Sequence, residues 1–231
     1  MQKILAFSKV YLLDTLQNKL AFIFNLVFPL AFFVVNNFEL VGKTDIEQSK
    51  LIAGLSVYFA YIVLVSLLNL IIVPLIAERE QGMLLEYTLI SGNKSYPFLG
   101  LLLLQLVVLL LELLLFDITV YLMFPDIGGV TLGLLTLRAM SATLPVMGIL
   151  SLLLLPKIGQ QSVSVIVTLL ILTCFLLLRE KPAIWALLNP LQYIEQLVKF
   201  GFSWESLFVG VMYLVVGIFS VTKVDIAPKF R

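Results

Sequence analysis

Six long stretches without any charged residue constrain this chain more than any other feature of its sequence. They hold 19, 27, 17, 18, 21 and 17 consecutive uncharged positions, and the third and fourth stretches continue as apolar sequence past isolated charges. A helix needs about 20 apolar residues to cross a hydrocarbon core about 30 Å thick. The sequence therefore predicts six membrane spans, over residues 20–38, 51–77, 96–124, 131–155, 160–178 and 205–222.

The composition is typical of a chain whose main solvent is lipid. Hydrophobic residues make up 61% of the 231 residues and charged residues only 13%, whereas an ordinary soluble domain is about 25% charged. Backbone groups in lipid have no water to bond, so spans of this kind form helices. We therefore expect an all-α membrane protein, with residues 1–231 as a single transmembrane domain.

The ionisable residues exclude several classes of function. The 15 Lys and Arg residues nearly balance the 14 Asp and Glu residues, which gives nucleic-acid binding no electrostatic support. The chain has no His, so His-based catalysis and His metal ligation are excluded, and we expect neither an enzyme active site nor a metal site. Its loops are too short to form a soluble domain, so any energy source beyond an ion gradient must come from another chain.

The positions of Lys and Arg predict the orientation. An even number of spans leaves both ends on one side. If both ends lie in the cytoplasm, the cytoplasmic segments contain nine Lys and Arg residues and the external segments contain five. Arg138 is not counted, because it lies inside a predicted span. This excess favours both termini in the cytoplasm. Residues 1–19 interleave apolar and charged side chains near helical spacing, which is typical of an interfacial helix. An N-terminal extension of the first span is the alternative.

The loop after the second predicted span is the densest charge cluster in the chain. Residues 78–80 read Glu-Arg-Glu and end the longest uncharged run, so the helix enters water here. A glycine follows, which suits a turn out of that helix, and residues 83–87 then form a short amphipathic turn. The loop is either a docking site for a cytoplasmic partner or a solvated helix end. The candidate docking residues are Glu78, Arg79, Glu80, Gly82, Leu84 and Glu86.

Three segments resemble the membrane subunits of type-2 ATP-binding-cassette (ABC) exporters. Residues 78–84 read Glu-Arg-Glu-Gln-Gly-Met-Leu and match a Glu-Arg-Glu-x-Gly-x-Leu motif that follows the second span in that family. Residues 97–100, Pro-Phe-Leu-Gly, are similar to the start of the family's third span. Residues 189–193, Asn-Pro-Leu-Gln-Tyr, are similar to the segment before its last span. The family usually has a Thr-Pro pair after the motif, whereas here Leu89 follows Thr88.

The resemblance implies an interfacial elbow helix, six spans and a division of labour. Two permease subunits, identical or different, form a dimer in the membrane lipid. Each lies on a cytoplasmic ATPase, which binds ATP and Mg²⁺, and the permease itself binds no cofactor. In this scheme Glu78, Arg79 and Glu80 anchor the loop to the ATPase, and Gly82 sets its angle. ATP acts only through contacts that differ between two states, so the loop must transmit the motion as a rigid lever.

Three charged residues lie inside predicted spans, where charges are costly and usually face the bundle interior. Asp117 and Arg138 each lie seven residues from the outer end of their span, which is a depth of about 10 Å. We predict an ion pair between them, either to fix helix register or as part of a substrate or proton path. Glu112 lies deeper, near mid-membrane, and is either protonated or paired with Arg138.

Two further segments are interpreted from their composition. Residues 179–203 mix charges with Trp and Tyr, which is typical of the outer membrane interface. The resemblance implies a lid-like external segment here that includes Asn189, Pro190 and Tyr193, and an ordinary interfacial loop is the alternative. Residues 37–44 differ from a phosphate-binding loop only at their first position. They follow a membrane span and carry several acidic neighbours, so we reject nucleotide binding there.

These observations predict a multi-pass protein of the bacterial cell membrane. By the resemblance, it is the permease subunit of an ATP-driven exporter with an amphipathic cargo: a peptide, a lipid-like molecule or a drug. A haem-exporter-type permease has a similar size and number of spans, although the missing His disfavours haem handling. A non-transporting membrane protein, such as an immunity or sensor subunit, is the other alternative.

Overall fold

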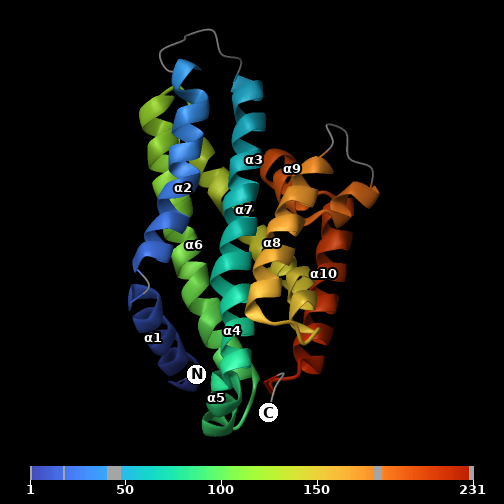
Figure 1. Ribbon diagram of the computed structural model, residues 1–231. Helices are drawn as coiled ribbons and strands as arrows, with labels where there is room; N and C mark the ends of the chain where they lie inside the picture. Colours follow the sequence, from blue (N-terminus) through green and yellow to red (C-terminus); the bar gives the residue numbers. More distant parts are fainter. Residues whose placement is uncertain (1, 18, 41–47, 179–183, 229–231) are drawn as a thin grey trace.

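The computed structural model describes residues 2–17, 19–40, 48–178 and 184–228. Within these ranges every regular element is helical, as the uncharged stretches predict, and Figure 1 shows a bundle elongated along one axis. The main helices are α1 (Gln2–Gln17), α2 (Lys19–Asn37), α3 (Gln48–Leu67), α4 (Val73–Gln81), α5 (Met83–Ser91), α6 (Ser95–Met123), α7 (Gly129–Leu150), α8 (Gln160–Leu176), α9 (Pro190–Phe200) and α10 (Trp204–Lys223). The shorter elements are η1 (Phe38–Leu40), η2 (Leu68–Ile72), η3 (Ser151–Leu154) and η4 (Ile184–Leu188).

Four helical stretches in the described ranges are long and apolar enough to cross a membrane. They are Gln48–Gln81, Ser95–Met123, Gly129–Leu154 and Trp204–Lys223, and they coincide with four of the predicted spans. The spans predicted over 20–38 and 160–178 fall on α2 and α8, whose apolar stretches are shorter, Val27–Asn37 and Gln161–Leu176. The four long helices indicate a multi-pass membrane protein.

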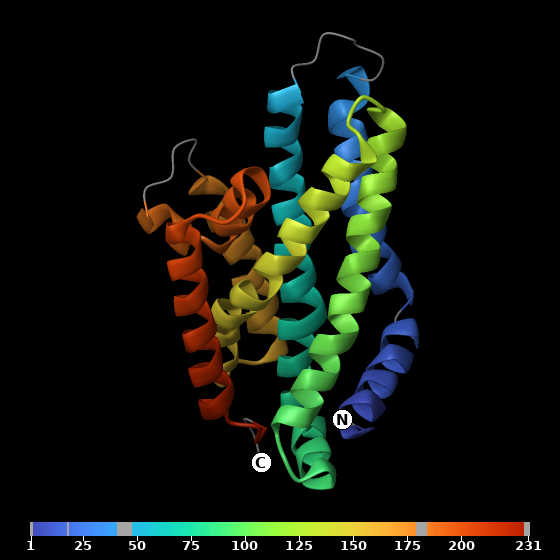
Figure 2. The same ribbon diagram turned by 180° about the vertical axis from the view of Figure 1, so that it is seen from behind.

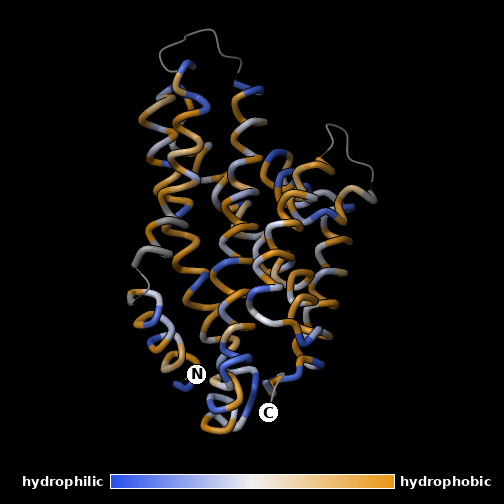
Figure 3. Tube along the Cα trace, viewed as in Figure 1, coloured by the Kyte–Doolittle hydropathy of each residue, from blue (hydrophilic) through white to orange (hydrophobic). Residues whose placement is uncertain are grey.

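Hydropathy changes along the long axis of the bundle. Figure 3 shows apolar residues over most of the length of the helices and polar residues gathered near the two ends, around α5 and at the far ends of α2 and α3. Many large apolar side chains on the outer surface are exposed, among them Leu176 and Val215. Lipid is itself an apolar solvent for such side chains, so only the inner face of each helix needs a protein neighbour.

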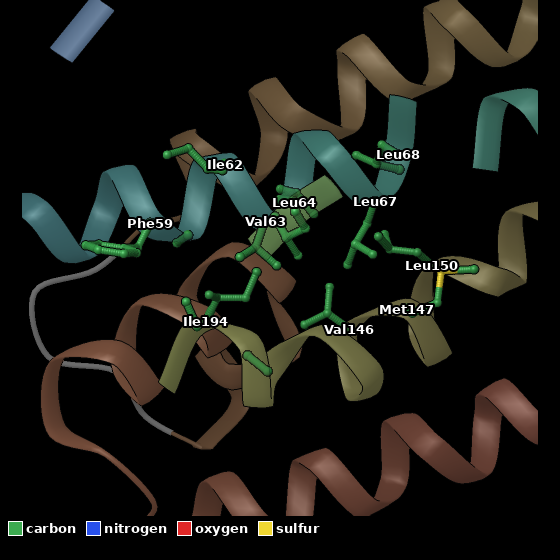
Figure 4. Packing of buried hydrophobic residues seen from close by; sticks show 14 of the residues in the cluster. Phe59, Ile62, Val63, Leu64, Leu67, Leu68, Val146, Met147, Leu150 and Ile194 are labelled. Atoms are coloured by element: carbon green, nitrogen blue, oxygen red, sulfur yellow. The ribbon is translucent and has the colours of Figure 1, made fainter. Parts of the chain in front are cut away.

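The interior is centred on α3. In Figure 4, Val63 of α3 lies close to Ile194 of α9 and Leu67 of α3 lies close to Val146 of α7, and all four side chains are buried. Helix α3 also packs against α2 and α6, so neighbours surround it. A helix that is apolar all round is the kind that proteins bury in this way.

Helices α7 and α10 cross at very close range. A Cβ atom on Gly148 would lie 2.3 Å from the carbonyl oxygen of Tyr213, and one on Gly217 would lie 2.5 Å from the Cα of Gly148. No side chain fits at either position, so the two glycines allow the backbones to touch. Figure 2 shows α7 crossing the bundle obliquely from the far end of α6 toward α10.

Helix α1 packs against the first turns of α6. The Ser8 hydroxyl donates to the carbonyl oxygen of Gly100 at 2.8 Å, and a Cβ on Gly100 would lie 2.6 Å from the Cβ of Phe7. Gly100 therefore lets α1 approach the α6 backbone. The start of α1 and the end of α10 lie at the same end of the bundle as α5 (Figure 1).

The longest helical stretch contains a change of winding. Element η2 is a π-helix, in which the N–H of Val73 donates to the carbonyl oxygen of Leu68. Pro74 follows directly and has no N–H to donate, so a regular ladder of α-helical hydrogen bonds cannot pass through it. The wider π-turn is one of the ways in which helices accommodate such an interruption.

Helix α9 lies beside α3 and α7, below the outer end of α3 (Figure 1). It begins at Pro190, and the side chain of Asn189 caps it by accepting a hydrogen bond from the N–H of Leu191 at 3.0 Å. Its buried apolar face includes Ile194 and Leu197. Of the external segment predicted over 179–203, residues 179–183 lie outside the described residues, as do residues 41–44 of the rejected phosphate-loop match.

Candidate functional site

Two glycines delimit α5 at one end of the bundle. Gly82 (φ +82°) ends α4, and Gly92 (φ +77°) ends α5, so both have the left-handed backbone that glycine adopts without strain. The turn predicted at Gly82 is confirmed. The chain reverses around the nine residues of α5, and we call α4 and α5 together (Val73–Ser91) the hairpin. Figure 1 shows α5 as the lowest element of the molecule.

Helix α1 holds one side of the hairpin. The Tyr11 hydroxyl donates to the carboxylate of Glu78 at 2.9 Å, and the Lys3 ammonium group donates to the carbonyl oxygen of Ser91 at 2.9 Å. The ring of Tyr87 lies edge-on to that of Tyr11, with 6.2 Å between the ring centroids. Polar and aromatic contacts thus join α1 to both helices of the hairpin.

The Tyr11 phenol is a permanent donor in this arrangement. Burial raises its pKa well above the usual value, and the neighbouring Glu78 carboxylate raises it further. Burial and Glu78 raise the pKa of Tyr87 in the same way. Both phenols therefore remain protonated at physiological pH, so the hydrogen bond to Glu78 does not depend on pH through Tyr11.

Replacing Tyr11 with Phe is expected to loosen α1 from the hairpin. A typical side-chain hydrogen bond contributes about 0.5–1.5 kcal/mol, and Phe keeps the ring but loses the bond. Amide hydrogen exchange should become faster in α1 and α5 of the purified protein. Tyr121→Phe is the matched control, because Tyr121 is an exposed tyrosine on α6 at the opposite end of the bundle. Equal exchange rates in Y11F and the wild type contradict this role of Tyr11.

Arg79 fixes the opposite side of the hairpin. Its side chain is only 4% exposed. The guanidinium group donates to the carbonyl oxygens of Leu154, Pro156 and Ile158 at 2.7, 3.0 and 3.3 Å. Leu154 is the last residue of η3, and Pro156 and Ile158 belong to the connection between η3 and α8. Arg79 therefore ties α4 to the chain that links α7 with α8, and its planar fork of donors suits this task.

The end of α10 and the segment after it are bound to residues that lie next to the hairpin. The Lys94 ammonium group donates to the carbonyl oxygens of Thr222 and Val224 at 2.5 and 3.4 Å. Lys157, in the connection held by Arg79, forms an ion pair with Asp225 at 2.6 Å. The hydrogen bond from Lys157 lowers the pKa of Asp225. The pair is exposed, so it orients the segment rather than stabilising the fold.

The exposed surface of the hairpin includes an apolar pair. Leu89 and Ile90 are 73% and 77% exposed, although they lie at the polar end of the bundle, and Glu86 beside them is also exposed. Sequence reasoning missed this pair because it resembles any other apolar dipeptide of the chain. One signal in the sequence could have identified the pair. The pair lies just before Gly92, at the point where the sequence departs from the family motif.

The structure divides the predicted docking residues into two groups. Glu80 and Glu86 are exposed to solvent, and the Glu80 carboxylate lies beside Gly159. Glu78 and Arg79 instead contact other parts of the chain, and Leu84 is buried. The inward-facing residues brace the hairpin, and the carboxyl groups of Glu80 and Glu86 lie on its exposed surface.

The predicted ion pair between Asp117 and Arg138 is wrong. The Asp117 carboxylate accepts from the Thr136 hydroxyl at 2.6 Å, whereas Arg138 donates to the carbonyl oxygens of Val198 and Lys199 at 3.0 and 3.5 Å. The physical reason is that α9 ends beside α7, and the last carbonyls of a helix have no partner within it. Arg138 satisfies them and caps α9.

The predicted pairing of Glu112 with Arg138 is wrong as well, because Arg138 is engaged with α9. One carboxyl oxygen of Glu112 accepts from the Ser66 hydroxyl, and the other is buried without a hydrogen-bond partner. Burying an unpaired ion costs several kcal/mol, whereas an unsatisfied neutral polar group costs about 1–3 kcal/mol. The geometry therefore favours the other predicted state, a protonated Glu112.

The predicted external residues come together at the start of α9. The Asn189 side chain donates to the carbonyl oxygen of Cys174 at 2.7 Å and caps α9, whose first residue is Pro190. Tyr193 is buried, with its ring centroid 5.4 Å from that of Tyr213. These contacts join α8, α9 and α10.

No protein-family model, curated protein or solved structure matches this chain. The contacts around the hairpin, together with the motif resemblance, are therefore the grounds on which a function is proposed.

Proposed function

We propose that this protein is the permease subunit of an ATP-driven exporter and that its hairpin docks on a separate cytoplasmic ATPase. In this proposal the chain lies in the plasma membrane of a bacterium, with both ends and α5 in the cytoplasm. Helix α1 lies in the inner interface, and α2 and α8 complete six spans. A second permease subunit forms the membrane dimer. The cargo is amphipathic: a peptide, a lipid-like molecule or a drug.

The bracing of the hairpin is the observation that carries this proposal. A docking element must be rigid, because a flexible loop absorbs a push instead of transmitting it. Helix α1 holds the hairpin through Tyr11 and Lys3, and Arg79 holds it from the other side. A solvated helix end has no need of contacts that fix it from two sides.

The exposed residues of α5 suit a protein partner. Leu89 and Ile90 offer an apolar centre, and the exposed carboxylates of Glu80 and Glu86 offer a polar rim, which is the usual anatomy of a protein interface. Motion of α5 passes along α4 through η2 into α3, and through Arg79 into the connection before α8. One docking event therefore acts on two spans together.

Replacing Leu89 and Ile90 with Asp is expected to release the ATPase. Tagged wild-type protein purified from its native membranes should bring down the ATPase. The L89D/I90D variant should retain about one tenth as much or less, since a loss of about 1.4 kcal/mol in binding free energy weakens binding tenfold. The measurement is the ratio of ATPase to permease in the eluate.

Val130→Asp is the matched control, because Val130 is 90% exposed at the start of α7, at the opposite end of the bundle. This variant should keep the ATPase bound. The proposal fails if V130D releases the ATPase as strongly as L89D/I90D does. It also fails if purified wild-type protein moves cargo across vesicles without any ATPase or nucleotide.

A further inference from the structure

The inward face of α6 carries two carboxyl groups that have no cation as a hydrogen-bond or ion-pair partner among the described residues. Glu112 is 4% exposed and Asp117 is 9% exposed. Each accepts one hydrogen bond, from the Ser66 and Thr136 hydroxyls, and each keeps one buried oxygen without a hydrogen-bond partner. Gln105, two turns earlier on α6, has a buried amide oxygen in the same condition.

The ionisable groups on the elements around α6 are engaged elsewhere or lie away from these carboxyls. Helices α1, α2, α3, α5 and α7 and the π-helix η2 pack against α6. Arg138 of α7 donates to the backbone of α9, and Tyr58 and Tyr61 of α3 are neutral phenols. The remaining described ionisable residues on these elements and on α6 lie toward the ends of the bundle: Lys3, Lys9, Tyr11, Asp14, Lys50, Glu86, Tyr87, Tyr96 and Tyr121.

The hydroxyl partners suit carboxyl groups that carry a proton. A hydroxyl both donates and accepts, so Ser66 accepts from a protonated Glu112 as readily as it donates to an ionised one. The second oxygen of the protonated group is then a neutral carbonyl oxygen. Leaving a neutral oxygen unpaired in a protein interior costs far less than leaving a charged one.

The gap beside Ser66, the hydroxyl partner of Glu112, is too small for a larger cation. The gap between α3, α6 and α7, lined by Ser66, Gln105 and Thr143, does not hold even a water molecule. A metal ion or an amine needs that volume and several polar partners besides. A proton needs no volume and removes the charge.

We propose that Glu112 is a proton-binding site inside the bundle. It holds a proton while α3, α6 and α7 are packed as described here, and it loses the proton to water when these helices part. Asp117 binds a second proton in the same way. Motions that open this interface are then linked to pH. The proposal goes beyond the exporter function, because it holds whether or not an ATPase binds.

Infrared spectroscopy of the full chain in lipid vesicles at neutral pH tests this site. The wild type should show the C=O band of a protonated carboxyl group, and labelling with ¹³C-glutamate should shift that band. The band should be absent in Glu112→Gln, which keeps the shape of the protonated group. Glu86→Gln, which removes an exposed carboxylate from α5, should leave the band unchanged.

A wild-type spectrum without a glutamate-derived band from a protonated carboxyl overturns the proposal without any variant. A full band in folded E112Q assigns the proton to another glutamate and overturns it too. If E112Q does not fold, Glu112→Asp keeps a carboxyl group but removes it from the glutamate label, so the labelled band should vanish there.

Discussion

Gly148→Ala is expected to destabilise the protein by about 3 kcal/mol, at the upper end of the cost of overpacking. The added methyl group would lie 2.3 Å from the carbonyl oxygen of Tyr213. That oxygen belongs to the backbone of α10 and cannot rotate away, so α7 and α10 must separate. The same crossing contains Gly217, and a Cβ atom added to Gly217 would collide with the Cα of Gly148. Thermal unfolding of the purified protein in detergent, followed by circular dichroism, measures the loss.

Gly133→Ala is the matched control for this prediction. Gly133 lies on the same helix, and a Cβ there meets nothing within 4 Å. Alanine in a helix is about 0.5–1 kcal/mol more favourable than glycine, so G133A should be as stable as the wild type or slightly more so. If G148A and G133A unfold at the same temperature, the close crossing of α7 and α10 is refuted.

Arg79→Met is expected to cost about 2–4 kcal/mol, because three carbonyl oxygens lose a charged donor. Methionine fills similar space, so the loss reports on the hydrogen bonds rather than on a cavity. The effect should be local as well as global. Amide hydrogen exchange should increase most in residues 154–159 and in the hairpin. If the hairpin docks on an ATPase as proposed, ATP hydrolysis by the complex should continue in R79M while cargo transport falls, because motion of the hairpin no longer reaches the connection before α8.

Two variants separate the role of Arg79 from that of charge alone. Arg79→Lys keeps the charge but not the planar fork of donors, so it should recover only part of the lost stability. Lys157→Met removes an exposed cation from the connection that Arg79 holds, and exposed ion pairs contribute little. If K157M is as damaging as R79M, the three carbonyl contacts are not the source of the stability.

The bounds of the four long apolar helices could be predicted from the sequence because the signal is local. A run of uncharged residues and its flanking charges fix a helix within a few positions, as the second predicted span (51–77) shows by lying inside the stretch Gln48–Gln81. Short-range chemistry also identified the turn at Gly82. The π-turn in η2 was not predicted, since its hydrogen-bond pattern depends on how Pro74 packs.

The partners of the buried charges could not be predicted for a physical reason. Asp117 and Arg138 were matched by depth and opposite sign, which assumes that a cation prefers a carboxylate. The end of α9 offered Arg138 two backbone carbonyls instead, and backbone groups have no signature in the sequence. The same holds for Arg79, whose three acceptors are all carbonyl oxygens. In the pattern of residues 1–19, Tyr11 is one apolar side chain among several, and its bond to Glu78 depends on a helix packing that the pattern does not contain.

The π-turn in η2 has a consequence for the direction in which α5 points. Each residue of an α-helix rotates the chain by about 100°, and a π-turn accommodates one extra residue. The π-turn absorbs that residue by a smaller rotation per residue, so α4, with Arg79 and α5, keeps nearly the azimuth of a regular helix that is one residue shorter. If the same residues were wound as a regular α-helix, α4 and α5 would turn by about 100° around the helix axis. The azimuth of the molecule's lowest element is thus set by the winding of η2, within the longest apolar stretch and well away from the surface that the element presents.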